Sequence, residues 1–96
     1  MMRLISKVYV KPENQEKFLE IVHKFVENTK TEEGYIDYSM NQSYENPDLF
    51  IFIEKWTNRE LQVVHCDTPF AKEYAPQMFA LTYQVDEVEF FEEIFC

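Results

Sequence analysis

The residues best suited to chemistry lie in one stretch of the chain, from Phe50 to Tyr74. Within it, Glu54, Trp56 and His65 stand among large apolar residues. A carboxylate and an imidazole can move protons, and an indole N–H or a phenol hydroxyl can hold a substrate oxygen. Such a mixture is typical of a lined pocket and equally of an ordinary core edge. The elements that carry these residues must therefore be considered next.

Composition excludes several other kinds of site. The chain has one glycine, Gly34, so loops of the P-loop or dinucleotide type, which need several glycines, are absent. The net charge of −9 disfavours binding to nucleic acid and to anionic membrane surfaces. With 46% hydrophobic residues, the 96-residue chain is expected to form a single domain, residues 1–96, around a modest core.

The cysteines and the apolar runs bear on compartment and cofactors. Cys66 and Cys96 form neither a CxxC pair nor a disulfide framework. No apolar run approaches the roughly 18 residues of a membrane-spanning helix, and the first ten residues are too short an apolar run for a signal peptide. We therefore expect a cytoplasmic protein with reduced thiols. No metal-ligand cluster is visible, and no metal or cofactor is expected.

Hydrophobic periodicity predicts an alternation of strands and helices. Apolar runs typical of strands occur at residues 3–11, 35–44, 49–57 and about 84–95. A helical period covers residues 13–30, and two shorter helices begin after Asn58 and at Thr68, each a capping residue. Broken alternation near Phe90 and Phe91 predicts a bulge in the last strand.

This order of elements predicts an α+β fold. The arrangement β-α-β-β-α-β is the ferredoxin-like, split βαβ motif, in which the helices cover one face of a four-stranded antiparallel sheet. The other face would be an apolar patch too large for most monomers, formed by Ile5, Tyr9, Leu49, Ile51 and Ile53. We therefore expect a homodimer in which the sheets of two chains pack face to face.

Several placements stay open at this level. In the second helix, Leu61, Val64 and His65 share an inner stripe, and His65 either faces a pocket or packs on the turn at Thr68. In the third helix the inward set is either Phe70, Tyr74 and Met78, or Ala71, Ala75, Met78 and Phe79. Glu54 on an apolar face needs a partner. It is either a perturbed base or, as is commoner, salt-bridged to Arg59, Lys7 or a partner chain.

The spacing of these residues resembles a known signature. Glu54 and Trp56, with His65 nine residues after the tryptophan and Thr68-Pro69 following, are similar to the E-x-W…H-x-x-[S/T]-P pattern of antibiotic biosynthesis monooxygenase (ABM) domains. The resemblance implies a dimeric α+β barrel with a pocket between sheet and helices in each subunit. Members include cofactor-free oxygenases of anthrones and hydroquinones, haem-degrading enzymes and enzymes of a phosphorylated signalling sugar, so the fold is better fixed than the reaction.

The resemblance also implies roles for individual residues. Trp56 would face the pocket and donate its indole N–H to a substrate oxygen, while His65 would act as base or hydrogen-bond partner. Strand alternation places Phe50, Phe52 and Glu54 on the same face as Trp56. The remaining pocket contacts would come from the third helix and the second strand, through Phe70, Tyr74, Asn41 and Tyr38.

Departures from the family's subtypes narrow the reaction. The first strand has no asparagine and the third helix no histidine, which disfavours haem degradation. Phe52 stands where anthrone oxygenases have an asparagine. Only Lys7, Arg59 and Lys72 are available to hold a phosphate. The leading hypothesis is a cofactor-independent monooxygenase of a small aromatic or quinol-type substrate.

Two alternatives stay open beside it. One is an acid–base isomerase or a degradation enzyme for a small oxygenated signalling metabolite, and the other is a non-catalytic dimeric module that binds a small molecule. The pocket discriminates between them. A dry aromatic pocket favours the oxygenase, and a polar hydrated one favours the isomerase. A pocket filled by Phe70, Tyr74 and Met78 favours the binding module.

Overall fold

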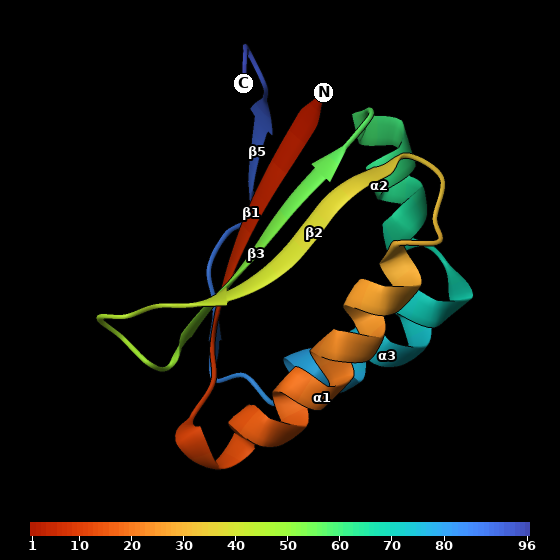
Figure 1. The fold of residues 1–96 in the computed structure, drawn as a ribbon. Coiled ribbons are helices and arrows are strands. Elements are labelled where there is room, and N and C mark those ends of the chain that lie inside the picture. The colour runs from red at the N-terminus through yellow and green to blue at the C-terminus, as the bar shows by residue number, and fades with distance from the viewer.

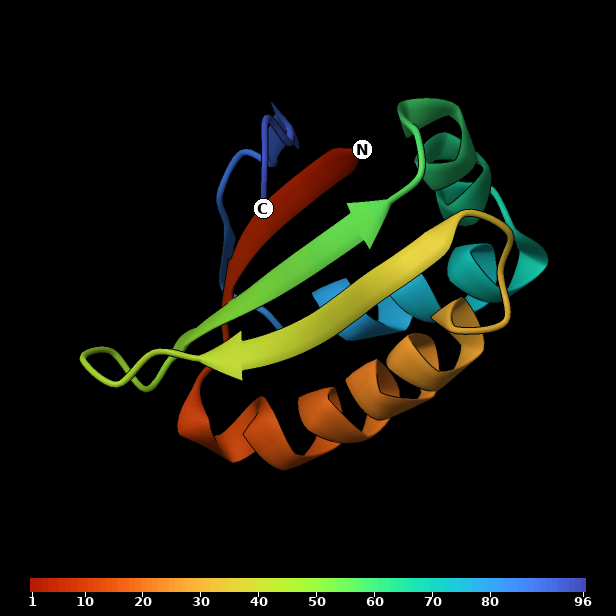
Figure 2. The ribbon, with the colours of Figure 1, turned by 45° about the horizontal axis from the view of Figure 1, so that its top comes forward.

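Three helices lie against one face of an antiparallel sheet in the computed structural model, which describes residues 1–96 (Figures 1 and 2). The elements in chain order are β1 (Met2–Tyr9), α1 (Pro12–Thr29), β2 (Tyr35–Gln42), β3 (Leu49–Trp56), α2 (Arg59–Cys66), α3 (Pro69–Phe79), β4 (Gln84–Val85) and β5 (Glu89–Glu92). The second helical segment is thus divided into α2 and α3, and the last strand into β4 and β5. The α+β, ferredoxin-like arrangement predicted from the sequence is confirmed.

The two central strands are those with the most continuous apolar character. The strand order is β2-β3-β1-β4. β5 follows β4 along the same edge of β1, where β4 pairs with the end of β1 and β5 with its beginning. β1 and β3 pair along their whole length, from Met2 opposite Trp56 to Tyr9 opposite Leu49. β2, the most polar strand, lies at an edge, as its composition predicted. The sheet therefore presents one continuous inner face, formed mainly by β1 and β3, to the helices.

The core lies between this inner face and α1. Alternate residues of β1 and β3 are buried, as a pleated strand with one covered face requires. Phe18 of α1 is fully buried, with its ring centroid 5.3 Å from that of Phe50 and 6.5 Å from that of Phe52. Burial of each such side chain contributes roughly 1.5–3 kcal/mol. The helix predicted from the period of residues 13–30 is confirmed, and Phe18, Ile21, Val22 and Phe25 form its buried apolar stripe.

The C-terminal strand differs from its prediction. The sequence predicted one strand over residues 84–95 with a bulge near Phe90, but the interruption lies at residues 86–88. There the Tyr9 hydroxyl donates to the Asp86 carboxylate across 3.0 Å, and the Asp86 N–H donates to the Lys7 carbonyl across 2.9 Å before the regular pairing is interrupted. Residues 89–92 pair regularly with β1. The broken alternation at Phe90 arises because no side chain of residues 84–96 is buried, so neither face needs to be apolar.

The outer face of the sheet has no helix against it (Figure 2). The apolar residues assigned to this face from the sequence are half-buried in the single chain: Ile5, Tyr9, Leu49, Ile51 and Ile53. Their placement on one face agrees with strand alternation. Pairing of two such faces stays a prediction. No helix has the length and apolar character needed to cross a membrane.

Candidate active site

A cavity of about 320 Å³ lies between the inner face of the sheet and the helices. Eleven of its fifteen lining residues are hydrophobic, so the interior is largely apolar. The full set is Leu4, Ser6, Phe25, Tyr38, Phe52, Glu54, Gln62, His65, Cys66, Ala71, Ala75, Met78, Phe79, Val88 and Phe90. This size is at the lower end of the range for small-molecule sites.

The floor of the cavity is a row of side chains across the sheet. Strand pairing aligns Tyr38 of β2 with Glu54 of β3, Glu54 with Leu4 of β1, and Leu4 with Phe90 of β5. Residues directly opposite one another on one face of a sheet are neighbours. The only charged member, Glu54, therefore lies between a tyrosine and apolar groups.

The helices form the roof. From α2 come Gln62, His65 and Cys66, whose spacing of i, i+3 and i+4 places them on one side of the helix. The stripe predicted for this helix is thus partly wrong, because Val64 is 59% exposed and Gln62 is buried in its stead. From α3 come Ala71, Ala75, Met78 and Phe79, the second of the two sets that the sequence left open.

His65 is the buried histidine of this cavity, with 6% of its surface exposed. Its Nδ1 lies 2.5 Å from Glu32 Oε1. Because a carboxylate can only accept, Nδ1 carries the hydrogen, and in the neutral imidazole Nε2 is then the nitrogen with a free lone pair. Its ring packs against those of Trp56, Tyr38 and Phe25, with centroid distances of 4.8, 5.9 and 5.9 Å.

The Nε2 atom of His65 is open to the cavity. It makes no hydrogen bond in the structure. Every side-chain nitrogen or oxygen atom that is fully buried does have a hydrogen-bond partner, so Nε2 is not one of the fully buried atoms. An unbonded polar atom of this nearly buried side chain must therefore reach accessible space, and the cavity is the space that His65 lines. His65 can thus accept a proton or a hydrogen bond from a molecule bound there.

Glu32 reaches His65 because of the turn that precedes β2. Gly34 has a φ of +87°, a conformation that favours glycine. A Cβ atom there would lie 2.6 Å from Leu61 Cδ1, so only glycine lets α2 pack this closely on the turn. The Thr57 N–H also donates to the Gly34 carbonyl across 2.9 Å. The contact of Glu32 with His65 was not predicted from the sequence, in which only Gly34 of this turn stood out.

The start of α3 holds the end of α2 in place. The Thr68 side chain accepts a hydrogen bond from the Ala71 N–H at 3.1 Å and donates to the His65 carbonyl at 3.0 Å. At the other end of α2, Asn58 accepts from the Leu61 N–H at 2.9 Å. Both predicted caps are therefore present, and they fix the short helix that carries His65.

Glu54 and Trp56 form a buried pair below the histidine. The Trp56 Nε1–H donates to Glu54 Oε1 across 2.9 Å. Burial raises the pKa of Glu54 above its ordinary value, while the Trp56 hydrogen bond and the nearby His65 act in the opposite direction. Neither Arg59 nor Lys7 pairs with it, so the salt bridge favoured from the sequence is not formed within the chain.

Two further titratable groups line the cavity. Burial raises the pKa of Tyr38 well above its usual value, and partial desolvation of the otherwise exposed Cys66, with the nearby Glu54 carboxylate, raises the pKa of its thiol. Both groups are therefore neutral near pH 7. Gln62 Nε2 donates to Cys66 Sγ at 3.2 Å. A protonated thiol is a poor nucleophile, so Cys66 is not suited to covalent chemistry here.

Comparison with other proteins places the chain in a family. The profile of the antibiotic biosynthesis monooxygenase (ABM) family matches residues 1–77. The chain belongs to the ABM family. Solved structures agree, because "antibiotic biosynthesis monooxygenase" at 26% identity superposes with a TM-score of 0.90 over 98% of this chain and 99% of that one.

Two related proteins have names that state either no reaction or only a putative one. "Putative monooxygenase YcnE" of Bacillus subtilis is 29% identical over 68 residues, which are 71% of this chain and 72% of that protein. "Uncharacterized protein sll1783" of Synechocystis sp. is 28% identical over 87 residues. These are 91% of this chain but only 59% of the Synechocystis protein, so the chain spans little more than half of that relative.

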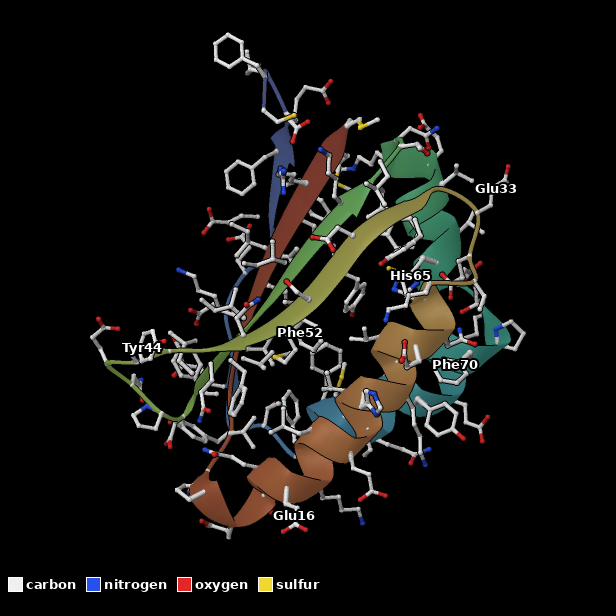
Figure 3. All side chains as sticks on the ribbon, viewed as in Figure 1. Glu16, Glu33, Tyr44, Phe52, His65 and Phe70 are labelled. Atoms are coloured by element: carbon white, nitrogen blue, oxygen red, sulfur yellow. The ribbon has the colours of Figure 1, made fainter.

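Four of the residues that the ABM resemblance assigned to the site line the cavity: Tyr38, Phe52, Glu54 and His65. Figure 3 shows His65 and Phe52 between the sheet and the helices. Trp56 is completely buried and its indole N–H is bonded to Glu54, so it is not free to donate to a substrate. It acts on the cavity through Glu54.

The other four do not line the cavity. Phe50 is buried beneath Phe18 in the core. Phe70 and Tyr74 stack on each other with centroids 4.6 Å apart, and Phe70 also packs on Phe25 of α1, farther from the sheet than His65 (Figure 3). Asn41 is exposed, and its amide donates to Ser39 Oγ and to the Ile51 carbonyl. It therefore belongs to the outer face.

Sequence reasoning also missed polar groups that the cavity brings together. Ser6 and Gln62 are buried and line it, and the Ser6 hydroxyl makes no side-chain hydrogen bond. Little in the sequence indicated them, because each is a single polar residue within an otherwise apolar stripe. The structure places no three or more His, Cys, Asp and Glu side chains where they could hold a metal ion together.

Proposed function

We propose that this ABM protein is a cofactor-independent monooxygenase of a small aromatic, hydroquinone-type substrate. The observation that carries this proposal is His65, whose Nε2 opens into an apolar cavity while its Nδ1 is held by Glu32. A substrate that itself donates electrons to O₂ needs a base, a fixed orientation and a water-poor site. His65 Nε2 supports the role of the base, and the largely apolar lining supports a water-poor site.

The geometry suggests how the reaction begins. A substrate hydroxyl placed against His65 Nε2 gives up its proton, and the resulting anion is the species able to reduce O₂. The Glu32 carboxylate holds the imidazole in one tautomer and stabilises the imidazolium that forms. The aspartate of a Ser-His-Asp triad does the same for its histidine. The aromatic rings of Phe25, Phe52 and Tyr38 provide apolar walls for a planar ring.

The lining supports the oxygenase over the other two hypotheses. No lysine or arginine lines the cavity, which is poorly suited to a phosphorylated sugar. The largely apolar lining fits the pocket expected of the oxygenase better than the polar one expected of the isomerase. The small side chains of Ala71 and Ala75 face the space that Phe70 and Tyr74 would otherwise fill, which leaves room for a ligand and weakens the argument for a binding module with a filled pocket.

The test is O₂ uptake by the metal-free protein with a panel of hydroquinones and anthrones. We expect uptake above the autoxidation blank and a loss of at least about tenfold in His65→Ala, since general base catalysis is worth about 10²–10⁴-fold. His23→Ala is the matched control, because His23 is exposed on α1. Equal rates in both variants would remove His65 from the mechanism. No uptake across the panel would favour acid–base chemistry or binding.

We also propose that two copies pair through their outer sheet faces. The support is the row of half-buried apolar side chains on β1 and β3, which no element of the chain covers. Sedimentation should therefore give a dimer. Ile51→Lys, at the centre of this face, should shift the protein towards monomer, whereas Val63→Lys on the exposed side of α2 should not. A monomeric unaltered protein would contradict the pairing.

A further inference from the structure

The second carboxylate of the site, Glu54, is built differently from Glu32. Only 6% of its surface is exposed, and its Oε1 is taken by the Trp56 indole. Its Oε2 makes no hydrogen bond, and no buried side-chain oxygen lacks a partner, so Oε2 reaches the cavity that Glu54 lines. One oxygen is thus anchored and the other is presented to a bound molecule.

The proposed reaction, on which this inference rests, removes protons from two different atoms of the substrate at two different steps. A hydroquinone and O₂ give a hydroxyquinone and water, so the substrate loses hydrogen from its hydroxyls and from the ring carbon that gains oxygen. His65 serves the hydroxyl. A ring C–H is cleaved at a different atom and at a later step, after the carbon–oxygen bond has formed.

We propose that Glu54 is the second proton-transfer residue, and that its free carboxylate oxygen removes the proton from the oxygen-bearing ring carbon. Beforehand, O₂ accepts electrons from the substrate anion and bonds to the ring, and the proton held by His65 completes the hydroperoxide. Glu54 then takes the C–H proton, the C–H electron pair forms a new C=O bond, and the O–O bond breaks. The departing hydroxide takes the proton from Glu54 and leaves as water, which returns Glu54 to its ionised form.

Apart from His65, whose Nε2 is placed at the substrate hydroxyl, no other group facing the cavity is suited to this step. Tyr38 and Cys66 are neutral and have no base to offer near pH 7. Glu32 lies behind His65 and is occupied by Nδ1. Burial makes Glu54 a stronger base than an exposed glutamate, and the Trp56 N–H favours its ionised form, so that it can still accept a proton.

The first experiment compares Glu54→Gln with the unaltered protein, using O₂ uptake with ring-deuterated and ordinary hydroquinone. Glutamine keeps the shape and the acceptor for Trp56 but cannot take a proton. We expect the rate to fall at least about tenfold and the deuterium isotope effect to rise, because C–H cleavage becomes rate-limiting. Glu16→Gln, on the exposed side of α1 (Figure 3), is the matched control and should behave as the unaltered protein.

The pH–rate profile provides a second readout. Trp56→Phe removes a hydrogen bond to the ionised carboxylate, so the pKa of Glu54 rises further and the acid limb of the profile moves to higher pH. In the Glu54→Gln background the same replacement should not move that limb. Glu54→Asp, which keeps the charge but withdraws it, should give an intermediate rate.

The outcomes separate the two proposals. Uptake by the unaltered protein that persists undiminished in Glu54→Gln, with an unchanged isotope effect, overturns the role of Glu54 and leaves the oxygenase intact. A loss of rate in Glu54→Gln without a larger isotope effect also overturns proton abstraction from carbon. Absence of uptake by the unaltered protein overturns both proposals.

Discussion

The two ends of the cavity are built on different principles. At the deep end, Tyr38, Glu54 and His65 are buried and come from β2, β3 and α2. At the mouth, Cys66, Phe79 and Phe90 are exposed, and Val88 is half-buried in the break between β4 and β5. The deep end is held by core packing and by hydrogen bonds to Glu32 and Trp56, whereas the mouth includes a strand that buries none of its side chains.

This difference separates two tasks. A group that transfers protons must hold its geometry within a fraction of an ångström, and surrounding packing provides that rigidity. A group that only covers a bound ligand tolerates more motion. We therefore expect replacements at the deep end to lower kcat and replacements at the mouth to change KM.

Among replacements that test this difference between the two ends, Glu32→Gln is expected to change the kinetic constants most. The amide oxygen can still accept from His65 Nδ1, but the negative charge that stabilises the imidazolium is lost. We expect kcat for O₂ uptake to fall at least about tenfold with little change in KM. Glu33→Gln is the control, because Glu33 is exposed and points away from the site (Figure 3). A normal kcat in Glu32→Gln would show that His65 needs no carboxylate.

A smaller effect is expected from Phe90→Ala at the mouth. The Arg59 guanidinium lies 4.2 Å from the Phe90 ring centroid, and such an exposed contact is worth about 0.5–1 kcal/mol. We expect KM to rise a few-fold, with kcat and the melting temperature nearly unchanged. Phe91→Ala, one position along the same strand and so on its other face, should leave both kinetic constants unaltered. A fall in kcat with Phe90→Ala would contradict the division between the two ends.

Much of the fold followed from periodicity. The buried stripe of α1 and the alternation of β1 and β3 are local patterns, and local patterns are visible in a sequence. The break at residues 86–88 was not, because no local pattern marks where pairing with β1 moves from Val8 and Tyr9 to the stretch from Met2 to Ile5. Likewise the two candidate faces of α3 are both apolar, and only packing against α1 decides between them.

The site was predicted less completely than the fold. His65, Glu54 and Phe52 were recognised through the spacing of one stretch, and the structure brings them to one cavity. Glu32 lies 33 positions before His65, and no periodic pattern links them. Their contact depends on the left-handed backbone of Gly34, which allows α2 to approach the turn. Trp56 was expected to meet the substrate, but its indole serves Glu54.

The exposed character of residues 84–96 has an evolutionary consequence. Most of these side chains are exposed, so we expect their exchange to alter the folding free energy little. The exceptions are Val88, which packs on the cluster of Met2, Leu4 and Trp56, and Glu93, which pairs with Arg3 and Lys55. The rim of the cavity can therefore diverge between relatives while selection on stability retains the strands and helices that hold the proton-transfer groups. Under the proposed function, a change confined to the last strand would alter the fit of the substrate and leave His65 and Glu54 in place.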